Sequence, residues 1–260
     1  MQISIFNINK KTNTITYLIK GVKPYFINSI RRAIIAYTPT LAIEDVEFRK
    51  NTSVLYDEII AHRLGLIPLK TDLDTYELPS KCSCKGAGCA RCQVKVILKE
   101  KGPKMVKAKD LKFNDPKIKP VYPEMPIVKL LENQELELEA IAVLGQGKDH
   151  AKWSPAHVYY RNMPVIKIKN KKTSKALEIV NKCPKQLFKI ENQMLTLDEK
   201  NLWKCSLCEA CKEIAPNDIE FSYKEDEFLF FVESFGQLEH KDIMIKACEM
   251  LKEELNALKL

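Results

Sequence analysis

The sequence predicts an α+β fold, in which helices and strands are interleaved along a chain of 260 residues. Two stripes of apolar residues with helical spacing lie near the two ends of the chain, and residues that alternate between apolar and polar lie between them. The first pattern is typical of amphipathic helices and the second of strands with one buried face. Two groups of four cysteines lie between the stripes, so we expect inserted segments that are held together by metal or by disulfides.

The first elements are expected to be a β-hairpin and a helix. Residues 3–8 and 14–19 are rich in strand-forming side chains and flank a polar turn. Pro24 suits the first turn of a helix, where its missing N–H is not needed, and Thr38 before Pro39 favours an end there. The apolar side chains that recur at helical spacing in this helix are Phe26, Ile27, Ile30, Ala33, Ile34 and Tyr37.

A strand and a short helix are expected next. Residues 43–48 alternate and contain β-branched side chains, which favours a strand. Residues 51–53 have side-chain oxygens that can cap a helix over residues 57–64, and Gly65 suits its end. Charged residues lie at the polar ends of these elements, where a solvated flank is the ordinary interpretation. They are Arg31, Arg32, His62 and Arg63.

At the other end of the chain, residues 228–232 predict a strand, Gly236 ends it, and a helix is expected from about residue 239 to residue 260. This helix has an apolar stripe that is too wide to stay exposed. The stripe can pack on the sheet of its own chain or on an equivalent helix of a partner, and both can hold at once. Its members are Ile243, Ala247, Leu251, Leu255 and Leu258.

Residues 28–36 and 51–69 together resemble the signature of the α-like assembly subunits of cellular RNA polymerases. This family comprises bacterial α, the third-largest subunit of eukaryotic polymerase II and the archaeal D-type subunit. The resemblance implies a discontinuous α-like dimerisation domain, made of residues 1–40 and 221–260, in a non-catalytic platform on which the large catalytic subunits assemble for transcription. The subunit-interface residues expected on these elements are Phe26, Ile30, Arg31, Arg32, Ile34, His62, Arg63, Ile243, Ala247, Leu251 and Leu255.

Residues 41–167 are expected to form an inserted mixed domain, and its loop 82–92 has four cysteines in C-x-C-x4-C-x2-C spacing. Four thiolates so close together can surround one Zn²⁺ at about 2.3 Å each, and a closed four-sulfur site has a structural role. Two disulfides, with three pairings open, or free thiols are the alternatives. Cytosolic redox conditions favour zinc. The cysteines are Cys82, Cys84, Cys89 and Cys92.

Residues 142–155 contain Gly147-Lys148, which invites comparison with a phosphate-binding loop. The comparison fails, because Ala142 replaces the first glycine and Asp149 replaces the hydroxyl residue after the lysine. The same run resembles the loop with which the polymerase family contacts the second-largest subunit, and an ordinary surface loop is the alternative. An aromatic residue is the best anchor of such an interface. On the resemblance, the interface residues are Lys148, Asp149, His150 and, as that anchor, Trp153.

Residues 168–220 are expected to form a ferredoxin-like insert that binds one iron–sulfur cluster. Bacterial-type ferredoxins take three ligands of a cluster from a C-x2-C-x2-C run and the fourth from a distant Cys-Pro. Cys183-Pro184 offers this fourth ligand, and Ala215-Pro216 stands where the cysteine of a second cluster would be. A four-iron cluster, a three-iron cluster and a single zinc ion remain open. The expected ligands are Cys183, Cys205, Cys208 and Cys211.

Composition limits the remaining function classes. The chain has 42 basic and 34 acidic residues, a surplus of +8 that is spread along the sequence and is typical of solvated surface. No apolar run approaches the roughly 18 residues of a membrane helix, and residues 1–11 lack the order of a signal peptide. We therefore expect a cytoplasmic protein without a membrane partner.

No catalytic residues are predicted in this chain. Phosphoryl transfer to RNA needs clustered carboxylates that hold Mg²⁺, and the Asp-x-Asp run at residues 72–74 has no third member nearby. The four histidines have no neighbouring cysteine or serine that suggests a nucleophile. On the resemblance, the chain is a non-catalytic subunit of a nucleotidyltransferase complex, the DNA-directed RNA polymerase.

Of the three family members, the archaeal one is the closest, because bacterial α lacks both groups of cysteines. The resemblance implies a heterodimer with a smaller α-like subunit (archaeal L) and contacts with the large catalytic subunits and with small zinc-binding subunits. Sequence-specific DNA binding is not expected, because the DNA-contacting domain of bacterial α has no counterpart in this sequence. The cluster is expected to be structural or redox-modulating. The alternatives are a free-standing iron–sulfur electron carrier with a dimerisation domain, and a nucleic-acid binder whose affinity would fall steeply with salt.

Overall fold

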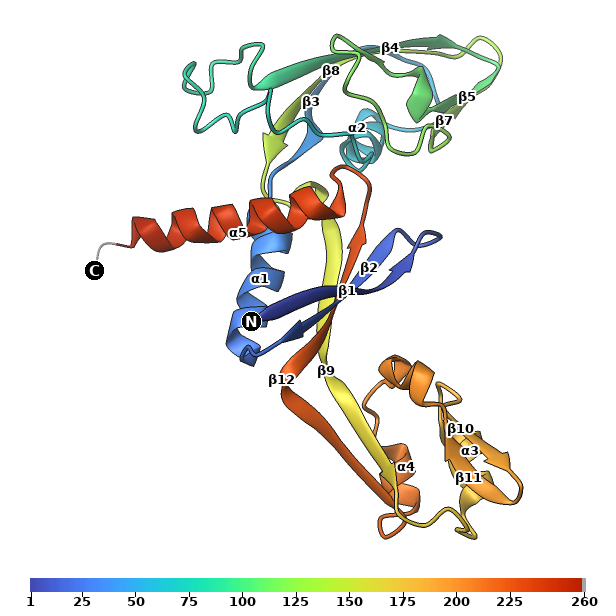
Figure 1. Ribbon diagram of the computed structural model, residues 1–260. Helices are drawn as coiled ribbons and strands as arrows, with labels where there is room; N and C mark the ends of the chain where they lie inside the picture. Colours follow the sequence, from blue (N-terminus) through green and yellow to red (C-terminus); the bar gives the residue numbers. More distant parts are fainter. Residues whose placement is uncertain (259–260) are drawn as a thin grey trace. The chain divides into compact units, whose positions relative to one another are not determined.

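The computed structural model describes residues 1–258 and has the α+β fold that the sequence predicts (Figure 1). Residues 259 and 260, the last two of the expected C-terminal helix and domain, lie outside the described part. The chain divides into two compact units, each formed by segments from distant parts of the sequence. This division does not test the three predicted domains, which remain a prediction. The first unit consists of Met1–Asn7, Thr16–Ile27 and Tyr159–Phe231, and the second of Ile8–Ile15, Asn28–Val158 and Val232–Leu260.

A four-stranded sheet contains the predicted N-terminal hairpin. Its strands are β1 (Gln2–Asn9), β2 (Thr14–Lys20), β12 (Ile219–Ser234) and β9 (Ala156–Ile168), in the order β1-β2-β12-β9. β12 has 16 residues and is far longer than the predicted strand over residues 228–232. Residues 222–226 of β12 are polar and exposed, so they do not show the apolar alternation by which a strand is recognised. The buried side chains of the sheet include Ile19, Phe228, Leu229, Phe230 and Val232.

α1 (Pro24–Tyr37) begins and ends where the sequence predicts. The N–H of Thr38 donates to the carbonyl of Ala33 at 3.2 Å, and Pro39 then prevents a further helical turn. One face of α1 is buried, while Tyr25 on the other face is 75 % exposed. The buried side chains are Ile27, Ile30, Ala33 and Ile34.

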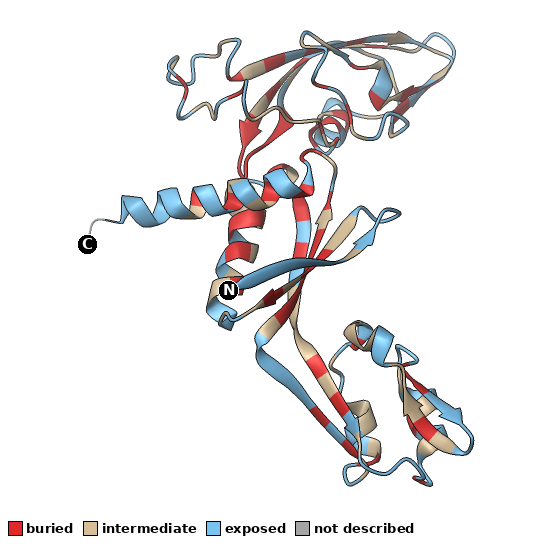
Figure 2. Cartoon of the chain, in the orientation of Figure 1, coloured by how far each residue is buried: buried red, intermediate tan, exposed pale blue. Residues whose placement is uncertain are grey.

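α5 (His240–Ala257) is the predicted C-terminal helix, and its apolar stripe is covered over one half only. Ile243 and Ala247 are fully buried. Leu255 and Leu258, farther along the same stripe, are 59 % and 63 % exposed, and this end of the helix is drawn as exposed in Figure 2. No helix among residues 1–258, α5 included, is both long enough and apolar enough to cross a membrane.

A second, antiparallel sheet forms the inserted domain. Its strands are β3 (Thr40–Asn51), β8 (Glu135–Gly145), β4 (Gln93–Lys101) and β6 (Lys112–Phe113), in the order β3-β8-β4-β6. Alternate residues of β8 are buried as predicted, because successive side chains of a strand point to opposite faces. They belong to one core with side chains of β4 and α2. Its members include Leu136, Leu138, Ala140 and Ala142 of β8, Val94, Val96 and Leu98 of β4, and Ile60 and Leu64 of α2.

α2 (Asp57–Gly65) is confirmed as a helix, but the prediction of its cap was wrong. The N-cap is Tyr56, not one of residues 51–53, and no side chain caps it. Asn51 instead donates from Nδ2 to Oδ1 of Asp57 at 2.7 Å, so its side chain closes the loop ahead of the helix. Two acidic residues in the first turn of α2 compensate the positive end of the helix dipole.

The segment over residues 116–126, a connector with four prolines, contains no strand before Pro126. The strand that begins there pairs in antiparallel fashion with a short strand from the other side of the connector. The remaining elements of this domain are β5 (Lys104–Lys107), η1 (Ala108–Asp110), β7 (Pro126–Leu130) and η2 (Ala151–Trp153).

The cysteine-rich insert has a small core of its own. Its elements are α3 (Ala176–Lys182), β10 (Phe188–Glu191), β11 (Met194–Leu197), η3 (Glu199–Lys204) and α4 (Ala210–Ile214), of which β10 and β11 form an antiparallel pair. Its buried apolar side chains include Ile166, Ile179, Leu187, Phe188, Leu195 and Ile219. A core of this size buries little apolar surface, so ligation of a metal is expected to contribute to the folding of the insert.

The core of the inserted domain provides a test of the fold. Leu98 on β4 is fully buried, whereas its neighbour Ile97 points to the opposite face and is 48 % exposed. We expect Leu98→Ala to lower the free energy of unfolding by about 2–5 kcal/mol and Ile97→Ala to lower it by less than about 1 kcal/mol. Urea titration of the full chain, followed by circular dichroism, measures both values. Equal effects of the two substitutions would contradict the faces assigned to β4.

Candidate metal centres and subunit interfaces

The loop 82–92 lies between α2 and β4, and its own backbone gives it a compact shape. The N–H of Cys92 donates to the carbonyl of Cys89 at 3.0 Å and closes a turn. Gly86 and Gly88 have φ values of +84° and +89°, which glycine adopts without the strain that a side chain would cause. The glycines therefore allow the chain to reverse within the few residues that separate the cysteines.

The four sulfur atoms of this loop converge on one point. All four lie within 4.8 Å of one another, and the Sγ atoms of Cys82 and Cys89 are 3.5 Å apart. Sulfurs bound to one tetrahedral ion at about 2.3 Å lie about 3.8 Å apart, whereas the sulfurs of a disulfide lie about 2.05 Å apart. All four cysteines are free thiols in the structure. Their arrangement therefore fits one four-coordinate metal ion and does not contain the two disulfides that were the alternative.

The protonation of these thiols also favours a bound cation. Burial raises the pKa of Cys92 to about 12, and hydrogen bonds from the thiols of Cys82 and Cys92 lower the pKa of Cys84 to about 6. The thiolate of Cys84 is thus stabilised, whereas Cys92 keeps its proton. A divalent cation stabilises all four thiolates together, and this is the chemistry that a structural metal site supplies.

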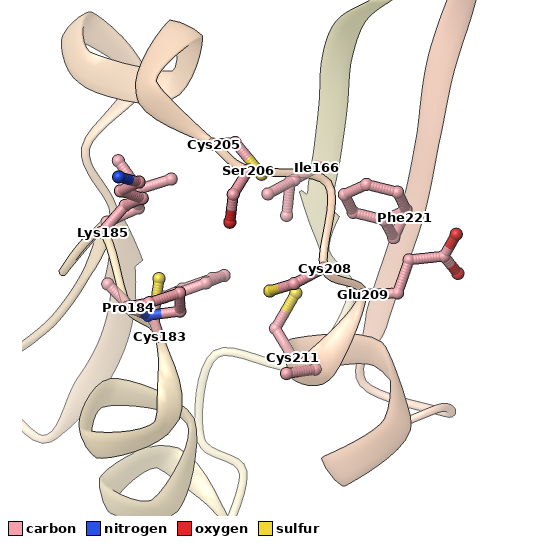
Figure 3. Close-up of a pocket in the computed structure, with 13 residues that line it drawn as sticks. Ile166, Cys183, Pro184, Lys185, Cys205, Ser206, Cys208, Glu209, Cys211 and Phe221 are labelled. Carbon is pink, nitrogen blue, oxygen red and sulfur yellow. The ribbon is translucent and has the colours of Figure 1, made fainter. Parts of the chain in front are cut away.

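The second group of cysteines lines a small pocket in the insert, with a cavity volume of about 20 Å³. Figure 3 shows their sulfur atoms turned toward this pocket from several elements. The structure therefore brings the Cys-Pro and the C-x2-C-x2-C run together, as the sequence predicts. The cysteines are Cys183, Cys205, Cys208 and Cys211, and the apolar part of the wall includes Ile166, Pro184, Leu187, Phe188 and Phe221.

Local backbone geometry positions these ligands. Cys183 is the C-cap of α3, and Cys205 directly follows η3. Between Cys205 and Cys211, the backbone is left-handed at Leu207 (φ +58°) and Glu209 (φ +57°). Residues with side chains rarely adopt this conformation, and such positions concentrate at binding sites. These two residues turn the chain so that closely spaced cysteines can face one centre.

The pocket is buried on one side and open on the other. Cys205 is 7 % exposed, while Cys208 is exposed to solvent. Burial raises the pKa of Cys205, and it raises that of Cys211 to about 11. Thiolates at these positions therefore need a compensating positive charge. Among residues 1–258, the sulfurs of the loop 82–92 are the group that is close enough to share a single ion, so the pocket cysteines are spaced more widely.

The loop between β8 and β9 contains the residues expected to contact the second-largest polymerase subunit. Lys148, Asp149 and His150 are exposed, whereas Trp153 is buried, with 7 % of its surface exposed. The indole lies directly against Gly145, where an added Cβ would be 2.2 Å from the ring. Trp153 therefore supports the loop from within the chain, and the three exposed residues form the outer surface of the loop.

The other residues expected at interfaces divide into a buried and an accessible group. The buried ones stabilise their own chain, and they are Ile30, Ile34, Ile243 and Ala247. The accessible ones are exposed or partly exposed, and they are Phe26, Arg31, Arg32, His62, Arg63, Leu251 and Leu255. Two of the arginines have partners within the chain. Arg31 donates to Oδ1 of Asn28 at 2.9 Å, and Arg63 donates to the carbonyl of Pro126 at 2.8 Å.

Sequence reasoning missed one charged residue close to the cysteine-lined pocket. Nη2 of Arg161 on β9 donates to the carbonyl of Trp203 at 2.5 Å, shortly before Cys205. No motif in the sequence marks this arginine, because its partner is 42 residues away.

Comparisons with known proteins agree with this architecture. Residues 43–168 match the RNA polymerase Rpb3/RpoA insert domain. Several relatives named DNA-directed RNA polymerase subunit Rpo3 match nearly the whole chain. The relative from Methanosphaera stadtmanae is 42% identical over 247 residues, which cover 92% of this chain and 90% of the relative. Those from Methanosarcina acetivorans (40% over 255 residues, 97% and 94% covered) and Pyrococcus furiosus (37% over 257 residues, 96% and 93% covered) are similar.

The matched insert domain and the relatives of nearly full length together show an α-like subunit of a cellular RNA polymerase. Identity of 37–42% with these relatives over nearly the full length places the chain more closely, and it belongs to the family of DNA-directed RNA polymerase subunit Rpo3, the archaeal D-type subunit. The resemblance drawn from residues 28–36 and 51–69 is thereby confirmed.

The loop 82–92 provides a test of metal binding. We expect Cys92→Ser to remove the metal ion of the loop, because a closed site loses one of its four ligands. Metal analysis of the purified full chain measures the loss. Cys248→Ser is the matched control, since Cys248 lies on α5 outside both cysteine groups. Unchanged metal content in Cys92→Ser would show that the loop does not bind the ion.

Proposed function

We propose that this chain is a non-catalytic assembly platform of DNA-directed RNA polymerase. It pairs with a smaller α-like subunit, equivalent to the archaeal L-type subunit, and recruits the large catalytic subunits and the small zinc-binding subunits. Relatives of nearly the same extent are named as subunits of this enzyme. The observation that carries the proposal is the half-covered apolar stripe on α5.

The uncovered half of this stripe is the part that a partner helix would bury. Leu251 is partly buried, and Leu255 and Leu258 follow it at helical spacing with most of their surface exposed. Burial of one leucine side chain contributes about 1.5–3 kcal/mol. An equivalent helix of a second α-like subunit offers a surface of the same kind, and a pseudo-symmetric pair of helices covers both stripes together.

The Asp-x-Asp run at residues 72–74 has a structural explanation. Oδ1 of Asp72 accepts a hydrogen bond from the N–H of Asp74 at 3.0 Å. Its Oδ2 accepts from the hydroxyl of Thr75 at 2.8 Å and from Nζ of Lys117 at 3.3 Å. These hydrogen bonds, foremost that of the Thr75 hydroxyl, lower the pKa of Asp72. The carboxylate is already used by its neighbours, which supports a role outside the catalytic centre.

The metal complement proposed is one zinc ion in the loop 82–92 and one iron–sulfur cluster, 4Fe-4S or 3Fe-4S, in the pocket of the insert. The close sulfur spacing of the loop suits a single ion. The wider spacing around the pocket suits a cluster, because each cysteine of a cluster binds a different iron. When bound, the cluster supplies folding energy and a centre that can gain or lose one electron. The exposed Cys208 makes this centre accessible to oxidants.

A free-standing electron carrier is not favoured. The similarity to polymerase subunits spans both ends of the chain, including α1 and α5. A carrier needs a cluster and an exposed route for electrons, and it has no need of these two helices.

The heterodimer can be tested on α5. We expect Leu255→Glu/Leu258→Glu to weaken binding of the smaller α-like subunit more than about 10-fold, because two apolar contacts are replaced by charges that must be desolvated. Co-purification and titration of the purified chains measure the affinity. Leu177→Glu on α3 is the matched control, since Leu177 is 65 % exposed but lies outside the stripe. Wild-type affinity of the double variant would contradict the proposed interface.

The redox-modulating role of the cluster has a separate test. The wild-type chain, purified anaerobically with its partner, is expected to contain roughly three or four irons and as many labile sulfides. Cys205→Ser/Cys208→Ser should lose both and should bind the partner more weakly, because the insert loses its metal-dependent folding energy. If the variant loses iron but keeps full affinity, the cluster has no influence on assembly, and the platform function remains.

A further inference from the structure

Arg161 holds the segment that leads into the cysteine-lined pocket. It lies on β9 in the same compact unit as the insert. Nη2 of its guanidinium donates to the carbonyl of Trp203 at 2.5 Å, and the centre of the guanidinium lies 5.0 Å from the centre of the Phe231 ring on β12. Trp203 precedes Cys205, the first cysteine of the C-x2-C-x2-C run, by two positions. The arginine therefore fixes the backbone that delivers this ligand.

One polar atom of this arginine lacks a partner. Nε of Arg161 is buried, and no acceptor for its N–H is present among residues 1–258. A buried donor left without an acceptor costs about 1–3 kcal/mol, and native structures keep few of them. A buried positive charge is costly as well unless an anion faces it. A negatively charged acceptor facing Nε would therefore stabilise Arg161.

One of the ionisable groups near Arg161 is a cysteine that lines the pocket. Burial lowers the pKa of Arg161, and the nearby ionisable groups that oppose this effect are Tyr159 and Cys205. Arg161 is thus a cationic side chain close to Cys205, the first cysteine of the C-x2-C-x2-C run.

An iron–sulfur cluster supplies what Arg161 lacks. A cluster held by four thiolates has a net negative charge and presents sulfur atoms that accept hydrogen bonds, and both properties set its reduction potential. We propose that Arg161 is a positioning residue of the cluster. It fixes the Trp203 segment and places a positive charge beside the Cys205 side of the cluster, which slows loss of the cluster and raises its reduction potential. This inference rests on the cluster proposed above.

Contacts between aromatic rings connect the Trp203 segment with the sheet that contains β1, β9 and β12. The ring of Trp203 meets the ring of Phe6 on β1 edge to face, with their centres 5.8 Å apart. The ring of Tyr159 on β9 stacks on the ring of Phe231 at 4.5 Å, and Arg161 also contacts the Phe231 ring. Loss of the cluster would remove the negative charge beside Arg161. The ring contacts would then connect the change at the Trp203 segment with β1, β9 and β12.

The test uses the full chain, purified anaerobically with its cluster. Arg161→Met removes the charge and the donors at similar size, and Arg161→Lys keeps the charge. Lys204→Met is the matched control, because Lys204 adjoins Cys205 but is exposed, so solvent and salt screen its charge. Two quantities are measured: the rate at which a chelator removes iron, and the midpoint potential in a dithionite titration. In that titration each cluster takes up one electron and no bond of the chain is broken.

We expect Arg161→Met to lose its cluster about 10-fold to 100-fold faster and to shift the midpoint potential to a more negative value. Arg161→Lys should keep a potential near that of the wild type, and Lys204→Met should change neither quantity. Wild-type behaviour of Arg161→Met would overturn the inference. If Arg161→Met holds no cluster at all, a cluster retained by Arg161→Lys supports the inference, and equal failure of both folded variants overturns the role of the charge. A wild-type chain that takes up no iron overturns the cluster itself.

Discussion

The convergence of cysteine sulfurs is the constraint around which both cysteine-rich segments are arranged. The loop 82–92 contains no helix or strand, and its order comes from turns that bring four sulfurs within 4.8 Å of one another. The insert has a core of a few apolar side chains, among them Ile179 and Leu195, next to the pocket that its cysteines line. Segments of this size bury too little apolar surface to offset the conformational entropy of ordering them. With the proposed metal complement, the folding of both segments is therefore expected to be coupled to metal binding.

The proposed coupling would extend to the elements that a partner subunit would contact. Lys81, next to the first cysteine of the loop, forms an ion pair with Glu253 on α5 at 2.6 Å. Hydrogen bonding from Lys81 lowers the pKa of Glu253, but the pair is exposed, so it contributes little to stability. The ion pair instead affects position, because it holds the loop 82–92 beside α5, the helix whose apolar stripe is half exposed. In the insert, Arg161 and Trp203 join the cluster segment to the sheet in a similar way.

Regular periodicity made the main elements predictable, whereas features that depend on distant contacts were not. The cysteines of each run were recognised because their spacing is local, and Cys183 was recognised because a Cys-Pro pair marks it. The length of β12 was missed, since residues 222–226 are exposed and polar while the strand continues through them. The burial of Trp153 depends on Gly145, whose missing side chain leaves room for the indole. Arg161 has its hydrogen-bond partner Trp203 on another segment, and no one-dimensional pattern connects the two.

The distribution of charge also bears on what this chain binds. On the sheet of the inserted domain, basic residues are paired with carboxylates: Arg49 with Glu139 at 2.7 Å, and Lys50 and Lys101 with Glu135 at 2.9 Å each. Hydrogen bonds from the two lysines lower the pKa of Glu135 to about 2, so these pairs persist through the neutral range. A lysine already paired with a carboxylate releases few counterions when it meets a phosphate. The surplus of positive charge is therefore not concentrated on this face, and apolar contact through α5 is the stronger basis for association.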